Sequence, residues 1–154
     1  MNEKQIQNHL FPWLENRKQT LITPNVRLYG KLESDLISVS RAKLITEFEI
    51  KCTVYDFNRD FQVKRKKHLR LSSGNSFSGS IPNYFWFAFN HRLFKRIETL
   101  DVPEYAGIVV VEKSGQVKEI KRPKRLHCRP ATERDLNYLY RGLMYRFWNY
   151  RLEA

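Results

Sequence analysis

Hydrophobic and polar positions along this chain follow two different periods, and the change from one to the other outlines the expected elements. Near the start, apolar residues recur every three or four positions, which predicts a helix over residues 2–18. These residues are Ile6, Leu10, Trp13 and Leu14. Pro12 lies inside the pattern, so we expect the helix to kink or restart there.

Short apolar and β-branched runs bounded by turn residues predict strands in the middle of the chain. Pro24-Asn25 is expected to form a turn before the first of them, and residues 34–53 read as an antiparallel hairpin. The aromatic run PNYFWFAFN is expected to be a buried strand. The expected strands cover residues 26–30, 34–40, 44–53, 82–90, 106–112 and 116–121.

Helical patterns separate and follow these strands. Residues 56–70 are expected to form a helix with Asp56 as its N-cap, 71–80 a loop, and 91–98 a short helix. The last helix is expected over 132–151, capped by Thr132 with Asp135 three residues on. This order predicts one α/β domain over residues 1–154, with a mixed β-sheet and helices on its faces.

The net charge of the chain indicates the kind of partner that it binds. Lys and Arg total 28 against 16 Asp and Glu, a net charge of +12, which is typical of proteins that bind a polyanion. No apolar run is long enough to span a bilayer, and the N-terminus is polar, so we expect a cytoplasmic protein that binds nucleic acid rather than a membrane. The two cysteines, Cys52 and Cys128, and the four histidines lack the spacing of a zinc site.

Candidate chemistry is concentrated in the expected hairpin. Because side chains of a strand alternate between faces, Glu47, Glu49 and Lys51 share one face, and Asp35 lies beside Glu49 where the two ends of the hairpin meet. Close carboxylates repel each other unless a cation lies between them, and Mg²⁺ prefers such oxygen ligands. Lys51 would stabilise an attacking hydroxide. The alternative interpretation is an exposed strand face with salt-bridged charges.

These residues resemble the signature of the PD-(D/E)XK nuclease superfamily. Its core is a helix, a three-stranded meander, a helix and a further strand, with an acid at the start of the second strand and an acid-x-lysine on the third. Asp35 matches the first acid and Glu49-Ile50-Lys51 the second motif, while Ser34 stands where the name-giving proline would be. The runs EFEIKCTVYDFNRDFQVKRKKH, PNYFWFAF and PEYAGIVVVEKSGQVKEIKRPKRLH are similar to small phage and bacterial nuclease-like proteins of that superfamily. The resemblance covers roughly residues 3–128.

The resemblance implies a nuclease that hydrolyses DNA phosphodiester bonds, in DNA repair, recombination or phage DNA processing. It implies Mg²⁺ or Mn²⁺ held by Asp35, Glu49 and the backbone carbonyl of Ile50, with Lys51 assisting the water. RNA is not excluded as a substrate. The alternatives are a non-catalytic nucleic-acid-binding module of the same fold and a basic phage accessory protein.

The superfamily usually adds a glutamate from the first helix, and three residues compete for this role. Glu3 lies on the helical line of the apolar residues and is expected to face the sheet, so it ranks first. Glu33 ranks second because it shares a face with Asp35, and Glu15 ranks last because it turns away from that line. For Glu3, the alternative is a first-turn acid that favours the helix dipole.

Two further segments suggest contacts with partners. The run KRKKHLR follows the expected site, so phosphate contact competes with a solvated helix face as its interpretation. The candidate nucleic-acid-binding residues are Lys64, Arg65, Lys66, Lys67 and His68. The last helix mixes aromatic residues with arginines, and we expect its apolar side to pack on the sheet. The excess aromatic side chains would alternatively form a homodimer contact.

Overall fold

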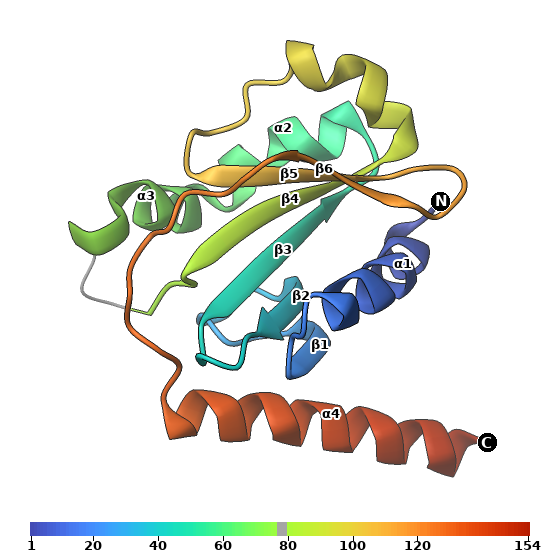
Figure 1. The fold of residues 1–154 in the computed structure, drawn as a ribbon, viewed down its shortest axis with the longest axis vertical. Helices are drawn as coiled ribbons and strands as arrows, with labels where there is room; N and C mark the ends of the chain where they lie inside the picture. The colour runs from blue at the N-terminus through green and yellow to red at the C-terminus, as the bar shows by residue number, and fades with distance from the viewer. Residues whose placement is uncertain (77–79) are drawn as a thin grey trace.

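The computed structural model of the protein describes residues 1–76 and 80–154, which form one six-stranded sheet with helices on its faces (Figure 1). The strands follow each other in the sheet in chain order as β1 (Leu21–Val26), β2 (Ser34–Val39), β3 (Ile45–Lys51), β4 (Tyr84–Asn90), β5 (Ala106–Val111) and β6 (Val117–Lys121). The helices are α1 (Glu3–Asn16), α2 (Val54–Val63), α3 (Arg65–Ser73) and α4 (Glu133–Glu153), with 3₁₀ helices η1 (Gly74–Ser76) and η2 (His91–Thr99). The predicted fold class, a mixed α/β sheet with helices, is confirmed.

The sheet combines antiparallel and parallel pairs. Strands β1, β2 and β3 form an antiparallel meander in which Leu36 pairs with Phe48, so the predicted hairpin is confirmed. Strand β4 runs parallel to β3, β5 runs parallel to β4, and β6 is antiparallel to β5. Parallel neighbours need a crossover connection, and α2 with α3 supplies the one between β3 and β4.

The core lies in layers on the two faces of the sheet. Helix α1 covers one face, where its Ile6, Leu10 and Leu14 pack against apolar residues of β2 to β5. Helices α2 and α3 cover the other face, against the alternate side chains of β4 and β5. The aromatic rings fully buried there include Phe57 of α2 and Phe85, Phe87 and Phe89 of β4. The expectation of a buried aromatic strand is therefore confirmed.

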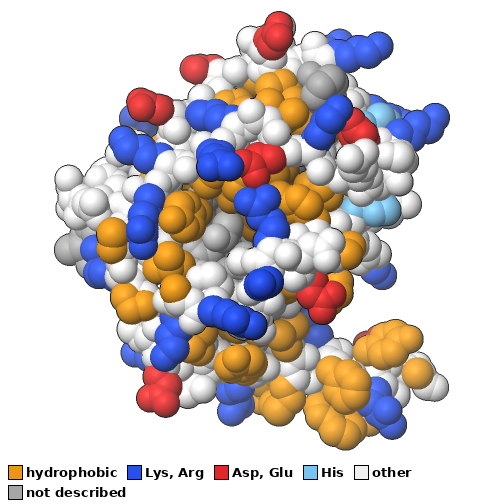
Figure 2. Space-filling view, viewed as in Figure 1, with side chains coloured by type: hydrophobic (Ala, Val, Ile, Leu, Met, Phe, Trp, Pro, Cys, Tyr) orange, Lys and Arg blue, Asp and Glu red, His pale blue; other side chains and the backbone are white. Residues whose placement is uncertain are grey.

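Helix α4 packs against the edge of the sheet and extends past it (Figure 1). Leu139 is fully buried against residues of β1 and β2, and the predicted cap of Thr132 with Asp135 is present. The prediction that the whole apolar side packs is wrong for Tyr140, Tyr145 and Phe147, which are about half exposed. The reason is that α4 contacts the edge strand β1, which offers a narrow surface, and Figure 2 shows hydrophobic side chains on the free end of the helix. Within the described residues, no helix has the length and apolar character needed to cross a bilayer.

The first strand differs from its predicted position. Residues 26–30 were expected to be a strand after a turn at Pro24-Asn25, but β1 ends at Val26 and contains both Pro24 and Asn25. A proline is tolerated there because β1 lies at the sheet edge and one side of its backbone needs no ladder partner. Asn25 adopts a positive φ of 49°, a conformation that asparagine tolerates better than most residues.

The helices also differ from the prediction in their boundaries. The expected helix 56–70 is two helices that meet at Lys64, and its N-cap is Thr53 rather than Asp56, because the Thr53 hydroxyl accepts a hydrogen bond from the Asp56 N–H. The expected loop 71–80 begins later, because α3 continues to Ser73, while residues 77–79 lie outside the described residues. Helix α1 continues through Pro12 as one element, so the expected restart is wrong. Its buried residues pack on the sheet on both sides of the proline, and such packing outweighs local propensity.

Candidate functional site

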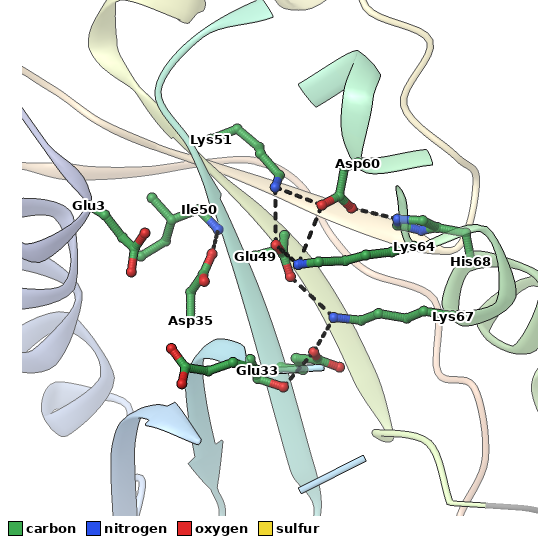
Figure 3. A network of polar contacts seen from close by, with 12 residues as sticks. Glu3, Glu33, Asp35, Glu49, Ile50, Lys51, Asp60, Lys64, Lys67 and His68 are labelled. Atoms are coloured by element: carbon green, nitrogen blue, oxygen red, sulfur yellow. Dashed lines mark hydrogen bonds and ion pairs between the residues drawn. The ribbon is translucent and has the colours of Figure 1, made fainter. Parts of the chain in front are cut away.

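Strand β3 and the helices that follow it assemble a buried polar cluster on one face of the sheet (Figure 3). Glu47, Glu49 and Lys51 point toward this face, while Phe48 and Ile50 point into the apolar layer under α1. The chain turns directly after β3 at the Thr53 N-cap, so α2 and α3 cross back over the strand. The predicted alternation of polar and apolar positions in β3 is therefore present, but the polar face is covered by helices and not exposed.

Glu49 lies at the centre of the cluster and contacts three ammonium groups. Its Oε1 is 3.0 Å from Lys51 Nζ and also contacts Lys64 Nζ, and its Oε2 is 3.1 Å from Lys67 Nζ. Burial alone would raise the pKa of Glu49, but the positive charges of Lys67, Lys51 and Lys64 outweigh it and hold the pKa below its usual value. Glu49 is therefore a stable carboxylate at neutral pH.

A chain of hydrogen bonds connects Lys51 through Asp60 and His68 to Tyr105. Lys51 Nζ is 2.7 Å from Asp60 Oδ1, Asp60 Oδ2 is 2.6 Å from His68 Nε2, and His68 Nδ1 is 2.5 Å from the Tyr105 hydroxyl. Burial would raise the pKa of Asp60, but the hydrogen bond from His68 and the charge of Lys51 lower it below its usual range. Burial would lower the pKa of Lys51, whereas Glu49 and Asp60 raise it above its usual value. The ammonium of Lys51 is thereby kept charged and held in one place.

Asp35 lies on the other side of Glu49, just beyond the end of the β2–β3 ladder (Figure 3). Its Oδ2 accepts a hydrogen bond of 2.6 Å from the backbone N–H of Ile50, so the side chain replaces a strand partner. Burial and the charge of Glu49 raise the pKa of Asp35 to about 7, although the Ile50 hydrogen bond opposes the shift. The structure thus brings Asp35, Glu49 and Lys51 together as the register predicted.

The neighbourhood of Asp35 includes polar residues that sequence reasoning did not single out. Gln7 Nε2 of α1 donates to the Asp35 backbone carbonyl at 2.7 Å and to Asn25 Oδ1 at 3.1 Å. Asn25 Nδ2 in turn donates to Glu3 Oε1 at 3.1 Å and to Glu33 Oε1 at 3.3 Å. The two best-ranked candidates for the third acid therefore share one amide next to Asp35. Glu3, Asn25 and Glu33 belong to different segments of the chain, so no local sequence pattern indicates this contact.

The three candidates for the third acid differ in their relation to Asp35. Glu3 is close enough for its charge to contribute to the raised pKa of Asp35, and Figure 3 shows it on the opposite side of Asp35 from Glu49. Glu3 is exposed to solvent, but its carboxylate is directed toward the sheet, because it accepts from Asn25 of β1. Glu33 is exposed as well, and Glu15 is an exposed residue in the last turn of α1. The arrangement keeps Glu3 as the first candidate.

The oxygen atoms at the carboxyl-terminal end of β3 are of the chemical type that a hard divalent cation prefers. Asp35 and Glu49 offer carboxylate oxygens, and the carbonyl of Ile50 points to the same side of the strand as its N–H, toward Asp35. Burial is the main cause of the raised pKa of Asp35, and the charge of Glu49 adds to it; a cation between the two carboxylates would offset both effects. Among the described residues, however, no three His, Cys, Asp or Glu side chains are grouped so that they could hold a metal ion. The ammonium groups of the cluster take the place of a cation around Glu49.

The basic run that was predicted to bind nucleic acid is divided between two environments. Lys64 and Lys67 lie inside the cluster and contact Glu49, and His68 is buried between Asp60 and Tyr105. Arg65 and Lys66 are exposed on the outer side of α3. Asp60 is the residue of this cluster that sequence reasoning missed, because its partners Lys51 and His68 lie on β3 and α3.

Comparisons with known proteins show the fold and no activity. No protein-family model matches the sequence, and no curated protein matches it. Among solved structures, the chain is similar to the SPO1766 protein of unknown function from Silicibacter pomeroyi, with a TM-score of 0.64 and 13% identity over 90% of this chain and 83% of that chain. This likeness supports the α/β architecture alone.

Proposed function

We propose that the protein is a metal-dependent nuclease that hydrolyses DNA phosphodiester bonds. The observation that carries the proposal is the meeting of Asp35, Glu49 and Lys51 at the carboxyl-terminal end of β3, with the pKa of Asp35 raised toward neutrality by burial and by Glu49. The order of a helix, an antiparallel three-strand meander, a helical crossover and a parallel strand supports the same resemblance that the sequence motif suggested.

The residues would divide the work as follows. Asp35, Glu49 and the Ile50 carbonyl would hold Mg²⁺ or Mn²⁺, which when bound lowers the pKa of a water and neutralises charge on the phosphate. Lys51, fixed by Asp60, stabilises the negative charge of the attacking oxygen. Lys64 and Lys67 hold Glu49 in the free protein, and a bound phosphodiester offers them a second anionic partner.

The net charge of +12 supports nucleic acid as the substrate class. The exposed Arg65 and Lys66 are the residues of the basic run best placed for contacts with the phosphate backbone. Replacing both with Ala should weaken binding to every DNA and flatten the slope of log K against log salt, measured by fluorescence anisotropy. The exposed Lys95 and Lys113, both changed to Ala, are the control for loss of two charges alone. An unchanged slope in the double variant would mean that this face does not contact phosphate.

A second function is favoured by the lysine contacts themselves. Both oxygens of Glu49 contact ammonium groups, which suits a nucleic-acid-binding module of this fold that does not cleave. Incubating the protein with linear and branched DNA and with RNA, in Mg²⁺, Mn²⁺ or EDTA, separates the two. Cleavage that requires a divalent cation supports the nuclease, whereas binding without cleavage under all three conditions supports the module.

A further inference from the structure

A cavity of about 300 Å³ lies beside the cluster, on the α3 side of the sheet. It is bounded by the connection between β1 and β2, by α3, and by the segment that leads into β4. Most of its wall area is apolar, and the apolar side chains of the wall are Tyr29, Leu32, Leu71, Ile81 and Pro82. Cavities of this size with apolar walls and few polar groups are typical of sites for small ring-containing ligands.

Glu47 lines this cavity and has one carboxylate oxygen without a partner. Its Oε1 accepts a hydrogen bond of 2.7 Å from the Ser34 hydroxyl and contacts Lys67 Nζ. Its Oε2 is buried and has no hydrogen-bond partner among the described residues, although the side chain is only 1% exposed. A buried acceptor without a donor destabilises the folded protein, so such an atom calls for a functional explanation.

Tyr29, which also lines the cavity, carries a second buried polar atom. The Tyr29 hydroxyl is buried without a hydrogen-bond partner among the described residues. Burial and the nearby charge of Glu47 raise the pKa of Tyr29 above its usual value, so the hydroxyl remains a neutral donor and acceptor. The cavity therefore combines a ring-sized apolar space with one carboxylate acceptor and one hydroxyl.

The rim of the cavity is positively charged. Lys31 and Lys66 are exposed at its edge, and Lys67 connects its floor to the neighbouring cluster, because its Nζ contacts both Glu47 and Glu49. A ligand in the cavity would thus place its ring against Glu47 and an anionic group within reach of the lysines. A nucleotide combines these features.

We propose that this cavity binds the cytosine base of a nucleotide through the exocyclic amino group of the base. A rotation of the Glu47 carboxylate turns its buried Oε2 toward the cavity to accept from the amino group, the ring lies between the apolar walls, and the phosphate faces Lys66. A carboxylate accepts hydrogen bonds and donates none, so it favours the N4 amino group of cytosine over the O4 carbonyl of uracil or thymine. The idea rests on the proposed function in one respect, because it assigns to the nuclease a preference for the nucleotide beside the scissile phosphate.

Binding of cytidine and uridine 5′-monophosphate to the whole protein in EDTA tests the proposal directly. The two ligands have the same size and phosphate and differ at the base edge. We expect cytidine monophosphate to bind about tenfold more tightly by isothermal titration calorimetry, as one good base contact provides. Equal affinities, or no binding of either nucleotide, would overturn the proposal.

Two variants and one control sharpen the test. Glu47→Gln keeps an oxygen for Ser34 and places an amide N–H₂ where Oε2 was, so the preference should shift toward uridine monophosphate. Leu32→Trp, at a rim position that is 38% exposed, should block binding of both nucleotides without changing Glu47. Glu112→Gln, at an acid that is paired with Lys118 and does not line the cavity, should leave the preference unchanged.

The outcomes are interpreted together with thermal unfolding of each variant. The assignment of the cavity would be wrong if a folded Glu47→Gln protein still preferred cytidine monophosphate. It would also be wrong if a folded Leu32→Trp protein still bound cytidine monophosphate. Because these titrations contain no metal ion, failure of the nuclease proposal would leave a cytidine preference intact. Failure of the cavity proposal would leave metal-dependent cleavage intact but without preference for an amino-bearing base.

Discussion

The buried carboxylate of Asp35 leads to a prediction about stability that needs no substrate. The pKa of this group rises from 3.8 to about 7 on folding, so the folded protein binds the proton more tightly than the unfolded chain does. Stability from this group is therefore fully present below about pH 4, declines as the pH rises from 4 to 7, and stays low above 7. Asp35→Asn removes the charge and keeps an oxygen that can accept from the Ile50 N–H.

The size of the effect follows from the shift. About 3 pKa units at 1.36 kcal/mol per unit give an upper bound of about 4 kcal/mol, reached above pH 7. Asp35 is not completely buried, and solvent screening reduces such energies, so we expect Asp35→Asn to stabilise the protein by about 2 kcal/mol at pH 8.5. At pH 5 the gain should be less than half of this, because the wild-type carboxyl is still protonated in the folded state.

Urea unfolding in EDTA at pH 5 and pH 8.5, followed by tryptophan fluorescence, measures both values. Asp101→Asn, at an exposed position away from the cluster, controls for loss of one negative charge from a basic protein. The reasoning is refuted if Asp35→Asn destabilises the protein at pH 8.5, or if its effect is the same at both pH values. Adding Mg²⁺ at pH 8.5 should stabilise the wild type and leave Asp35→Asn unchanged if the cation binds between the carboxylates.

Three further predictions concern the site and the fold. Glu49→Gln and Lys51→Ala should each abolish cleavage while DNA binding by anisotropy is retained, and wild-type cutting rates in both would contradict the proposed site. Glu3→Gln should slow cutting and weaken its response to Mg²⁺ in metal titrations with little change in unfolding temperature, whereas an effect confined to Glu33→Gln would reverse their ranking. Leu139→Ala should lower the free energy of unfolding by about 2–5 kcal/mol, because Leu139 is fully buried where α4 packs on the sheet, and a loss below 1 kcal/mol would show that α4 is not held there.

Local sequence determined the parts of this protein that depend on period and register. The twofold alternation in β3 separates Glu47, Glu49 and Lys51 from Phe48 and Ile50, because successive side chains of a strand point to opposite faces. A short hairpin then leaves one register that buries both strands, which places Asp35 next to Glu49. The capping box of α4 could also be predicted from the sequence, since it consists of two residues three positions apart.

Tertiary structure decided the environment of these residues. Lys64, Lys67 and His68 face the acids instead of solvent because α2 and α3 pack over the polar face of β3. Pro24 and Asn25 belong to a strand only because that strand lies at the sheet edge. Burial then sets the charge of each group, raising the pKa of Asp35 while three lysines lower that of Glu49. Contacts between residues far apart in the chain leave no periodic pattern in the sequence, so only the three-dimensional structure shows them.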